Sequence, residues 1–214
     1  MKKVQVSSTE LSDLKLGVWI DGLFTWLDED GWVYDKTKVN EQIKVFTNVA
    51  LNLSVTIKSN FYEETLLQVM TIQNGLHKER DIKLFFCQEL METKEESISF
   101  YAPSAQAIVR SYQKKLLLLN GKLKNRGIVQ YSTDFEDQCS LREGYVMLQP
   151  FSISSQVSIF SIEGEIKANE KVNAYFWLCI GNDEEDVLRN NAVTQLNLSC
   201  LVNNETECLS RLGK

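Results

Sequence analysis

Two apolar segments on either side of a polar loop, within residues 66–86, constrain the fold of this chain most strongly. Side chains alternate with a period of two over residues 66–72, and apolar positions alternate again over residues 82–86. Between them lies Asn74-Gly75, a dipeptide that favours tight turns because these residues adopt positive φ with little strain. The pattern predicts two strands joined as a hairpin. Since an isolated hairpin is only marginally stable in water, further strands are expected around it.

Strand signals recur along most of the chain. Residues 16–27 indicate two short strands around the turn dipeptide Asp21-Gly22, and residues 43–57 alternate as a further strand. The apolar run 172–180 is continuous, which indicates a strand buried on both faces. Additional strands are expected over residues 32–35, 97–101, 107–112, 116–119, 127–132 and 145–162. The strand at 116–119 is expected to end at Asn120-Gly121.

The pattern changes after residue 181. Asn182 is followed by four acidic residues, and a polar cap followed by acids is typical of a helix N-terminus. Apolar residues then recur at helical spacing, at Leu188, Ala192 and Leu196. The sequence therefore predicts an all-β domain over residues 1–181, built as an antiparallel sandwich, and a helical, linker-like tail over residues 182–214.

Charge and composition argue against several classes of partner. The chain has 214 residues, a formal net charge of −6 and a pI of about 5.0. This disfavours nucleic acid or an anionic membrane as the main partner, because phosphate binding requires a basic surface. No apolar run reaches the roughly 18 residues of a membrane span. No apolar segment follows the N-terminal lysines, as it does in a signal peptide, so we expect a cytoplasmic protein.

The cysteine and histidine content predicts neither a metal site nor a cofactor. The five cysteines are scattered without a Cys-x-x-Cys pair, and His77 is the only histidine. Structural zinc requires clustered cysteines and histidines, and a nucleophilic triad requires a histidine beside the nucleophile. His77 lies among polar residues and is expected on the surface. The cysteines are expected to be free thiols.

Three acidic clusters are candidates for catalytic carboxylates, at Asp28–Asp30, Glu63-Glu64 and Asp183–Asp186. Glycoside hydrolysis requires two carboxyl groups on opposite sides of a pocket at a defined separation. Adjacent acids on a turn point apart and are solvated. We therefore interpret these clusters as surface charge and predict no catalytic residue.

Aromatic side chains are the strongest candidates for a binding site. Trp19, Trp26, Trp32 and Tyr34 lie within sixteen residues of each other. Sugars stack their apolar C–H faces on such rings, so these four residues could form a carbohydrate-binding platform. The alternative is that they pack in the core or at a domain interface, as large aromatic residues on strands commonly do.

Four segments occur in an order that resembles a known family. They are LGVWIDGLFTWLDEDGW (16–32), VMTIQNGLHKERDIKLFF (69–86), YAPSAQAIVRSYQKKLLLLNG (101–121) and GIVQYST (127–133). Together they resemble the N-terminal domain of bacterial and archaeal glycoside hydrolase family 15 proteins, the glucoamylase and glucodextranase-like enzymes. The resemblance covers roughly residues 16–181. It implies an antiparallel super-β-sandwich of the galactose mutarotase-like type.

In that family a helical linker joins the sandwich to an (α/α)6 barrel, which carries the general acid and the general base of an inverting glycosidase. The resemblance therefore implies that this chain lacks the catalytic barrel and is not an enzyme on its own. Its implied partner is such a barrel, whose site it would support. An oligo- or polysaccharide is the expected partner if the chain is instead a stand-alone carbohydrate-binding module.

Three segments depart from the family's pattern. A His-His-Asp-like run after Phe86 is replaced by Cys87-Gln88-Glu89, and a Gly-Asp-Thr-Ala-like segment is replaced by Ser97-Ile98-Ser99-Phe100. The loop 134–145 is also shortened and altered. If these loops face the barrel in intact enzymes, their divergence indicates that this surface no longer has to fit the barrel of that family.

Overall fold

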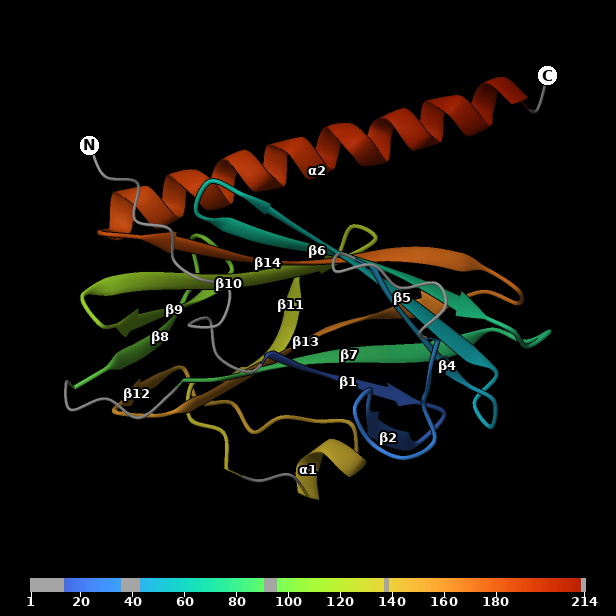
Figure 1. The fold of residues 1–214 in the computed structure, drawn as a ribbon, viewed down its shortest axis with the longest axis horizontal. Helices are drawn as coiled ribbons and strands as arrows, with labels where there is room; N and C mark the ends of the chain where they lie inside the picture. The colour runs from blue at the N-terminus through green and yellow to red at the C-terminus, as the bar shows by residue number, and fades with distance from the viewer. Residues whose placement is uncertain (1–13, 36–42, 91–95, 137–138, 213–214) are drawn as a thin grey trace.

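A computed structural model describes residues 14–35, 43–90, 96–136 and 139–212 of the chain (Figure 1). Two β-sheets pack face to face, and the helix α2 (Glu184–Leu212) lies along the outer face of the larger sheet. A short helix, α1 (Cys139–Arg142), lies beside the smaller sheet. The architecture confirms the predicted all-β antiparallel sandwich with a C-terminal helix.

Both sheets are built from antiparallel strand pairs. The five-stranded sheet has the order β11-β13-β7-β1-β2 and consists of β1 (Leu14–Ile20), β2 (Leu23–Trp26), β7 (Arg80–Glu89), β11 (Ile128–Ser132) and β13 (Val157–Ile166). The nine-stranded sheet has the order β12-β8-β9-β10-β14-β6-β5-β4-β3 and consists of β3 (Val33–Tyr34), β4 (Ile43–Asn48), β5 (Leu53–Tyr62), β6 (Thr65–Asn74), β8 (Ile98–Ala102), β9 (Ala107–Tyr112), β10 (Lys115–Leu123), β12 (Phe151–Ile153) and β14 (Lys171–Gly181).

Apolar side chains from both sheets fill the space between them. At its centre Phe86 and Phe160, from the smaller sheet, stack on each other with ring centroids 5.1 Å apart. Phe176, from the larger sheet, stacks on Phe86 at the same distance of 5.1 Å. All three side chains are almost completely buried. This aromatic cluster joins β7 and β13 to β14 across the sandwich.

The predicted turn at Asp21-Gly22 is confirmed. Asp21 and Gly22 have φ values of 52° and 81°, and Ile20 pairs directly with Leu23. Two central residues with positive φ form the type I′ turn that suits a two-residue hairpin. The buried strand predicted at 172–180 is also confirmed, as the central part of β14.

The predicted hairpin at residues 66–86 is wrong, because its two strands belong to different sheets. β6 pairs with β5 and β14, whereas β7 pairs with β1 and β13. Gly75 is not among the glycines with positive φ, but a Cβ there would lie 2.9 Å from the carbonyl oxygen of Asn52. Glycine is therefore required here by close approach of another segment, not by turn geometry.

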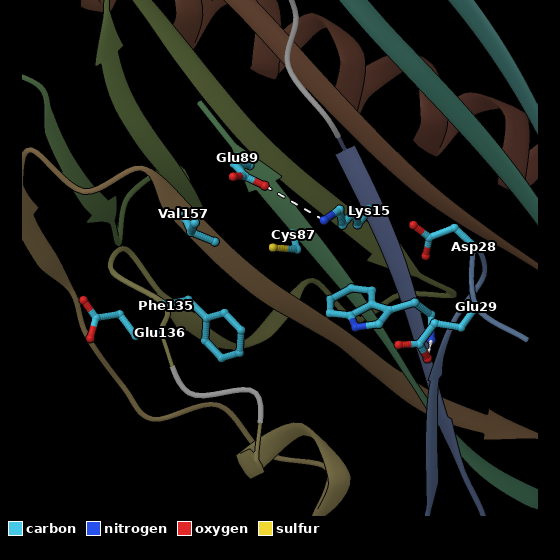
Figure 2. Close-up of a pocket in the computed structure, with 9 residues that line it drawn as sticks. Lys15, Asp28, Glu29, Cys87, Glu89, Phe135, Glu136 and Val157 are labelled. Atoms are coloured by element: carbon cyan, nitrogen blue, oxygen red, sulfur yellow. Dashed lines mark hydrogen bonds and ion pairs between the residues drawn. The ribbon is translucent and has the colours of Figure 1, made fainter. Parts of the chain in front are cut away.

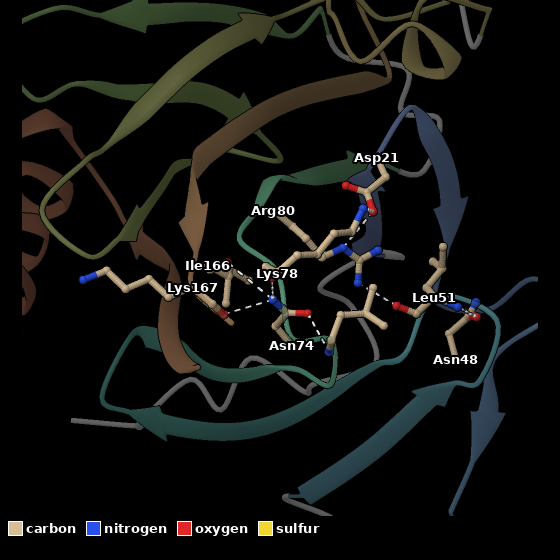
Figure 3. Close-up of polar contacts among 9 residues, drawn as sticks. Asp21, Asn48, Leu51, Asn74, Lys78, Arg80, Ile166 and Lys167 are labelled. Atoms are coloured by element: carbon tan, nitrogen blue, oxygen red, sulfur yellow. Dashed lines mark hydrogen bonds and ion pairs between the residues drawn. The ribbon is translucent and has the colours of Figure 1, made fainter. Parts of the chain in front are cut away.

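Asn74 organises this crossing between the sheets (Figure 3). Its side-chain amide donates to the carbonyl oxygens of Lys78, at 2.8 Å, and Lys167, at 2.9 Å. Its side-chain oxygen accepts the backbone N–H of Leu76 at 3.1 Å. The dipeptide thus fixes a loop that leaves one sheet and enters the other.

Residues 43–57, predicted as one strand, form two. β4 and β5 pair as a hairpin, with Asn48 opposite Leu53. The Asn48 side-chain oxygen accepts the backbone N–H of Leu51 at 3.0 Å, and Asn52 adopts a φ of 48°. Asparagine supports both features of the turn, since it bonds nearby backbone groups and tolerates positive φ.

The strand predicted to end at Asn120-Gly121 instead continues through it to Leu123. A Cβ on Gly121 would lie 3.0 Å from the Phe160 ring and 3.2 Å from the Tyr175 carbonyl oxygen. Gly121 therefore gives the facing sheet room to approach. The Asn120 side chain points to the opposite face of β10, because successive residues of a strand alternate, and its amide donates to Asn191 Oδ1 of α2 at 3.1 Å.

α2 begins at the predicted acidic run, but its cap is Asp183 and not the predicted Asn182, and of its predicted apolar face only Leu188 packs against the sheet. Asp183 caps the helix, since its side-chain oxygen accepts the backbone N–H of Asp186 at 2.9 Å. Leu188 is half-buried, whereas Ala192 is exposed and Leu196 is 67% exposed. Among the α2 side chains described, which extend to Ser199, those buried against the larger sheet are Val187, Asn191 and Leu198.

Asn191 explains why the contact face of α2 is not purely apolar. Its side-chain oxygen accepts the indole N–H of Trp177 at 2.8 Å as well as the amide of Asn120. These groups are all buried, and buried polar groups are stable only when they are hydrogen-bonded. The network therefore fixes the position of α2 on β10 and β14. Within the described ranges, no helix has the combination of length and apolarity needed to span a membrane.

Two buried arginines lie near opposite ends of β7. Arg80, at its start, donates to the Leu51 carbonyl oxygen at 2.6 Å and to Asp21 Oδ2 at 2.9 Å (Figure 3). Arg110 extends from β9 to the other end of β7, where it donates to the Gln88 carbonyl oxygen at 3.0 Å. Each guanidinium therefore connects the two sheets.

Arg110 is fully buried and its donors are well satisfied. Besides Gln88, it donates to Ser99 Oγ at 3.2 Å and to the carbonyl oxygens of Ser155, at 3.0 Å, and Gln156, at 2.9 Å. Burial lowers the pKa of Arg110 to about 10, which still leaves the side chain charged at neutral pH.

Substitution of Arg110 by methionine is expected to lower the free energy of unfolding by about 2–4 kcal/mol, because the buried carbonyl oxygens of Gln88 and Ser155 would lose a charged donor. Urea unfolding followed by tryptophan fluorescence measures this change. Arg126→Met, at an exposed position, is the matched control and should change stability by less than about 0.5 kcal/mol. Equal effects of the two substitutions would contradict the proposed role of Arg110.

Candidate functional site

The outer face of the smaller sheet carries a layer of aromatic side chains. Strand register places Trp19 opposite Phe24, and Gly17 opposite both Trp26 and Phe85. Phe24 contacts Trp26 edge to face, with ring centroids 5.0 Å apart. A Cβ on Gly17 would lie 2.7 Å from the Phe24 ring, so glycine provides the space in which these rings meet.

Residues 133–136 and 139–150, here called the covering segment, pack over this aromatic layer. Their apolar side chains Phe135, Leu141 and Val146 are buried in one cluster with residues of the sheet. Lys83 Nζ donates to the Gly144 carbonyl oxygen at 2.6 Å. The covering segment contains most of the loop that departs from the family's sequence pattern, and it lies against the sheet.

A cleft with a volume of about 370 Å³ opens beside the covering segment (Figure 2). Its lining residues come from β1, β2, the β2–β3 turn, β7, the covering segment and β13. They are Lys15, Trp26, Asp28, Glu29, Cys87, Glu89, Phe135, Glu136 and Val157. The cleft therefore combines aromatic surface with carboxylates that come from distant parts of the chain.

Acidic groups outnumber basic ones in the cleft. Lys15 Nζ lies 3.9 Å from Glu89 Oε2, a contact shown in Figure 2, and both side chains are substantially exposed. Glu29 Oε2 accepts the backbone N–H of Trp26 at 3.1 Å. Asp28 and Glu136 are exposed at the rim. The cleft thus presents many hydrogen-bond acceptors to a ligand, and few donors.

Cys87 lies in the wall of the cleft but is not suited to nucleophilic chemistry. Burial raises the pKa of its thiol from 9.0 to about 11, although the nearby Lys15 ammonium acts in the opposite direction. The reactive form of cysteine is the thiolate, so Cys87 is unreactive at neutral pH. Among the described residues, no group of histidine, cysteine and acidic side chains could hold a metal ion.

The structure does not bring the four candidate aromatic residues together. Only Trp26 lines the cleft, where it is 7% exposed. Trp19 packs beneath Gly144, and its indole N–H donates to the Arg142 carbonyl oxygen at 3.3 Å. The Trp32 indole donates to Thr25 Oγ1 at 3.3 Å. Tyr34, which is 36% exposed, belongs to the other sheet and packs against Phe46.

Several cleft residues carry no local signal in the sequence. Lys15 enters the cleft because the register of β1 places it opposite Cys87. Val157 enters because the register of β13 places it opposite Glu89. Phe135 and Glu136 arrive with the covering segment. Only the complete pairing of the smaller sheet brings these residues together.

A second surface feature lies on the outer face of the larger sheet. Phe100 pairs with Phe151 and Ile98 pairs with Ile153, so these four side chains form one exposed apolar cluster, here called the β8–β12 patch. Their exposed fractions range from 36% to 60%. The same face of the sheet carries Val109, which pairs with Phe100 and packs beneath α2.

Comparisons with known proteins show the fold but no sequence family. No family model matches the chain, and no curated protein matches it significantly. A bacterial glucoamylase complexed with acarbose has a similar structure, with a TM-score of 0.64 and 10% sequence identity over 90% of this chain and 30% of that one. The chain thus has the fold of the glucoamylase β-sandwich region, and spans about 30% of the length of that enzyme.

Two further solved structures align less closely. A polysaccharide lyase aligns with a TM-score of 0.47 and 8% identity, over 83% of this chain and 27% of that one. A protein described as a kojibiose phosphorylase, from the human microbiome, aligns with a TM-score of 0.39 and 12% identity, over 86% of this chain and 24% of that one.

The two buried thiols predict how stability depends on alkaline pH. Burial raises the pKa of Cys179, like that of Cys87, from 9.0 to about 11. Between these values the thiols ionise in the unfolded chain but stay protonated in the folded one, which favours unfolding. The free energy of unfolding should therefore fall as the pH rises from about 9 to about 11, by about 2 kcal/mol for each thiol.

Urea unfolding across this pH range, under reducing conditions, measures the effect. The variant Cys87→Ala/Cys179→Ala should show a flatter decline than the unmodified chain, whereas Cys139→Ala, at an exposed thiol, should not. The same slope in all three proteins would contradict the assignment.

Proposed function

We propose that this chain is a non-catalytic β-sandwich domain that packs against an α-helical (α/α)6 barrel of a glucan-hydrolysing glycosidase and supports the active site of that barrel. The observation that carries this proposal is the extent of the structural match: 90% of this chain aligns with only 30% of a bacterial glucoamylase. A domain of this kind needs a surface for its partner, and the β8–β12 patch supplies one.

The β8–β12 patch has the properties of a docking surface. Its four apolar side chains are contiguous because they lie on directly paired positions of neighbouring strands. Contiguous exposed apolar surface on a soluble protein commonly marks an interaction site. The patch also occupies the same face of the sheet as α2, the element that corresponds to the helical linker before the barrel. A barrel that docks on this patch would therefore cover the same face of the larger sheet as α2 does.

The patch includes Ile98 and Phe100, from a segment that departs from the family's sequence pattern. The apolar contact would therefore be a property of this chain and would require a barrel with a matching surface. Such a partner is most simply an (α/α)6 barrel that is encoded in the same genome without a sandwich domain of its own.

We propose no catalysis by the chain itself. The general acid of a glycosidase is typically held in an apolar pocket. The cleft carboxylates Asp28, Glu29, Glu89 and Glu136 are all exposed to solvent. The carboxylates of the cleft therefore suit ligand binding better than proton transfer.

The docking proposal predicts that the chain copurifies with such a barrel as a one-to-one complex. Phe100→Asp/Phe151→Asp should weaken the complex at least about tenfold, because two buried apolar contacts would be replaced by charges. Light scattering after size exclusion and calorimetric titration measure stoichiometry and affinity. Val49→Asp is the matched control, since Val49 is 74% exposed on the β4–β5 turn, away from the patch. Full affinity of the double variant would refute this docking surface.

The purified chain is expected to release no glucose from maltooligosaccharides, even at high protein concentration and long incubation. The measurement is chromatography of the reaction products, with a bacterial glucoamylase as the positive control. Release of sugar that is abolished by Glu136→Gln or Asp28→Asn would show instead that the chain is an enzyme.

A further inference from the structure

Trp26 is an almost completely buried tryptophan whose indole N–H has no acceptor among the described residues. Its side chain lines the cleft and is 7% exposed, and its indole N–H makes no hydrogen bond to any described residue. The other three tryptophans behave differently: the indoles of Trp19, Trp32 and Trp177 donate to Arg142, Thr25 and Asn191 respectively. Buried tryptophan N–H groups normally have a partner. The exception lies in the wall of the cleft, which indicates that a ligand supplies the acceptor.

From this observation and the composition of the cleft we propose that the cleft binds a neutral oligosaccharide. This inference goes beyond the docking proposal and concerns the opposite sheet. Nothing in it depends on a barrel partner.

A ligand whose groups both donate and accept hydrogen bonds matches the polar groups of the cleft. The Trp26 indole and the Lys15 ammonium can only donate, while the carboxylates of the rim can only accept. A hydroxyl group does both. An amine would satisfy the carboxylates but offer nothing to the indole. An array of hydroxyl groups, as on a sugar, satisfies both kinds of group at once.

The walls of the cleft suit the remaining surface of a sugar. Trp26 and Phe135, of which 7% and 8% respectively remain exposed, contribute aromatic surface to the lining of the cleft, and aromatic rings attract C–H groups. The volume of about 370 Å³ is at the lower end of the range for small-molecule sites, which suits about one or two sugar rings. The rest of an oligosaccharide would extend into solvent.

The charge of the cleft selects among sugars. Asp28, Glu29, Glu89 and Glu136 surround it, and Lys15 is the single basic residue in its lining. Like charges repel across such a site. Neutral oligosaccharides are therefore the expected ligands, and those built of uronic acids are excluded.

The test is isothermal titration calorimetry of the full chain with maltotriose, cellotriose and trigalacturonate. At least one of the two neutral sugars should bind, and trigalacturonate should not. Trp26→Phe keeps an aromatic ring but removes the N–H, so it should weaken binding about fivefold, as expected for one lost hydrogen bond. Trp32→Phe is the matched control, because the Trp32 indole bonds Thr25 and does not line the cleft; its affinity should equal that of the unmodified chain.

Absence of binding by both neutral sugars at about 10 mM, or equal binding of trigalacturonate, would overturn the proposal. Unchanged affinity of Trp26→Phe would do the same. If Trp26→Phe lowers the unfolding midpoint, Asp28→Asn/Glu136→Gln at the exposed rim replaces it, with a several-fold weaker affinity as the expected result. These outcomes are separable from those of the docking proposal, since Phe100→Asp/Phe151→Asp should leave sugar binding intact.

Discussion

The contact of Phe86 and Phe160 with Phe176 is the constraint on which the rest of the structure depends. Stacked sheets lie about 10 Å apart, so rings that stack across that space set the separation along their whole length. Gly121 shows how tightly this is fitted, because even a Cβ there would approach the Phe160 ring to 3.0 Å. Because the inner faces of the two sheets pack against each other, only the two outer faces and the loops can bind a ligand or a partner.

Polar groups fix the arrangement that apolar contact alone would leave adjustable. Burial of apolar surface has no direction, so it permits two sheets to slide or rotate. The guanidinium of Arg80, on the smaller sheet, donates to the Leu51 carbonyl oxygen in the β4–β5 turn of the larger sheet. The guanidinium of Arg110, on the larger sheet, donates to the Gln88 carbonyl oxygen of the smaller sheet. Asn191 does the same for α2, through Trp177 and Asn120. Each contact is satisfied in one relative position, which is how buried polar networks give a unique structure.

Local sequence predicted the strands well because alternation is a local property, but it failed where one dipeptide serves several purposes. Asp21-Gly22, Asn74-Gly75 and Asn120-Gly121 look alike in the sequence. The first is a hairpin turn, the second a crossing between sheets, and the third lies within β10. Glycine provides positive φ in the first and space for a distant segment in the other two. The cleft could not be predicted from local sequence either. Lys15 lies in it because of the register of β1, and Glu136 because the covering segment folds over the sheet.

The two outer faces differ in what covers them, and this difference separates their chemistry. On the larger sheet α2 buries the centre of the face and leaves the β8–β12 patch, which is apolar and lacks charged side chains. On the smaller sheet the covering segment buries an aromatic layer and leaves a cleft rimmed with carboxylates. The first surface suits another folded domain, and the second suits a small hydroxylated ligand. The two surfaces are nevertheless connected at one edge of the sandwich, because Ser152 of β12 donates a hydrogen bond to the Thr133 carbonyl oxygen of the covering segment, which also contributes Phe135 and Glu136 to the cleft.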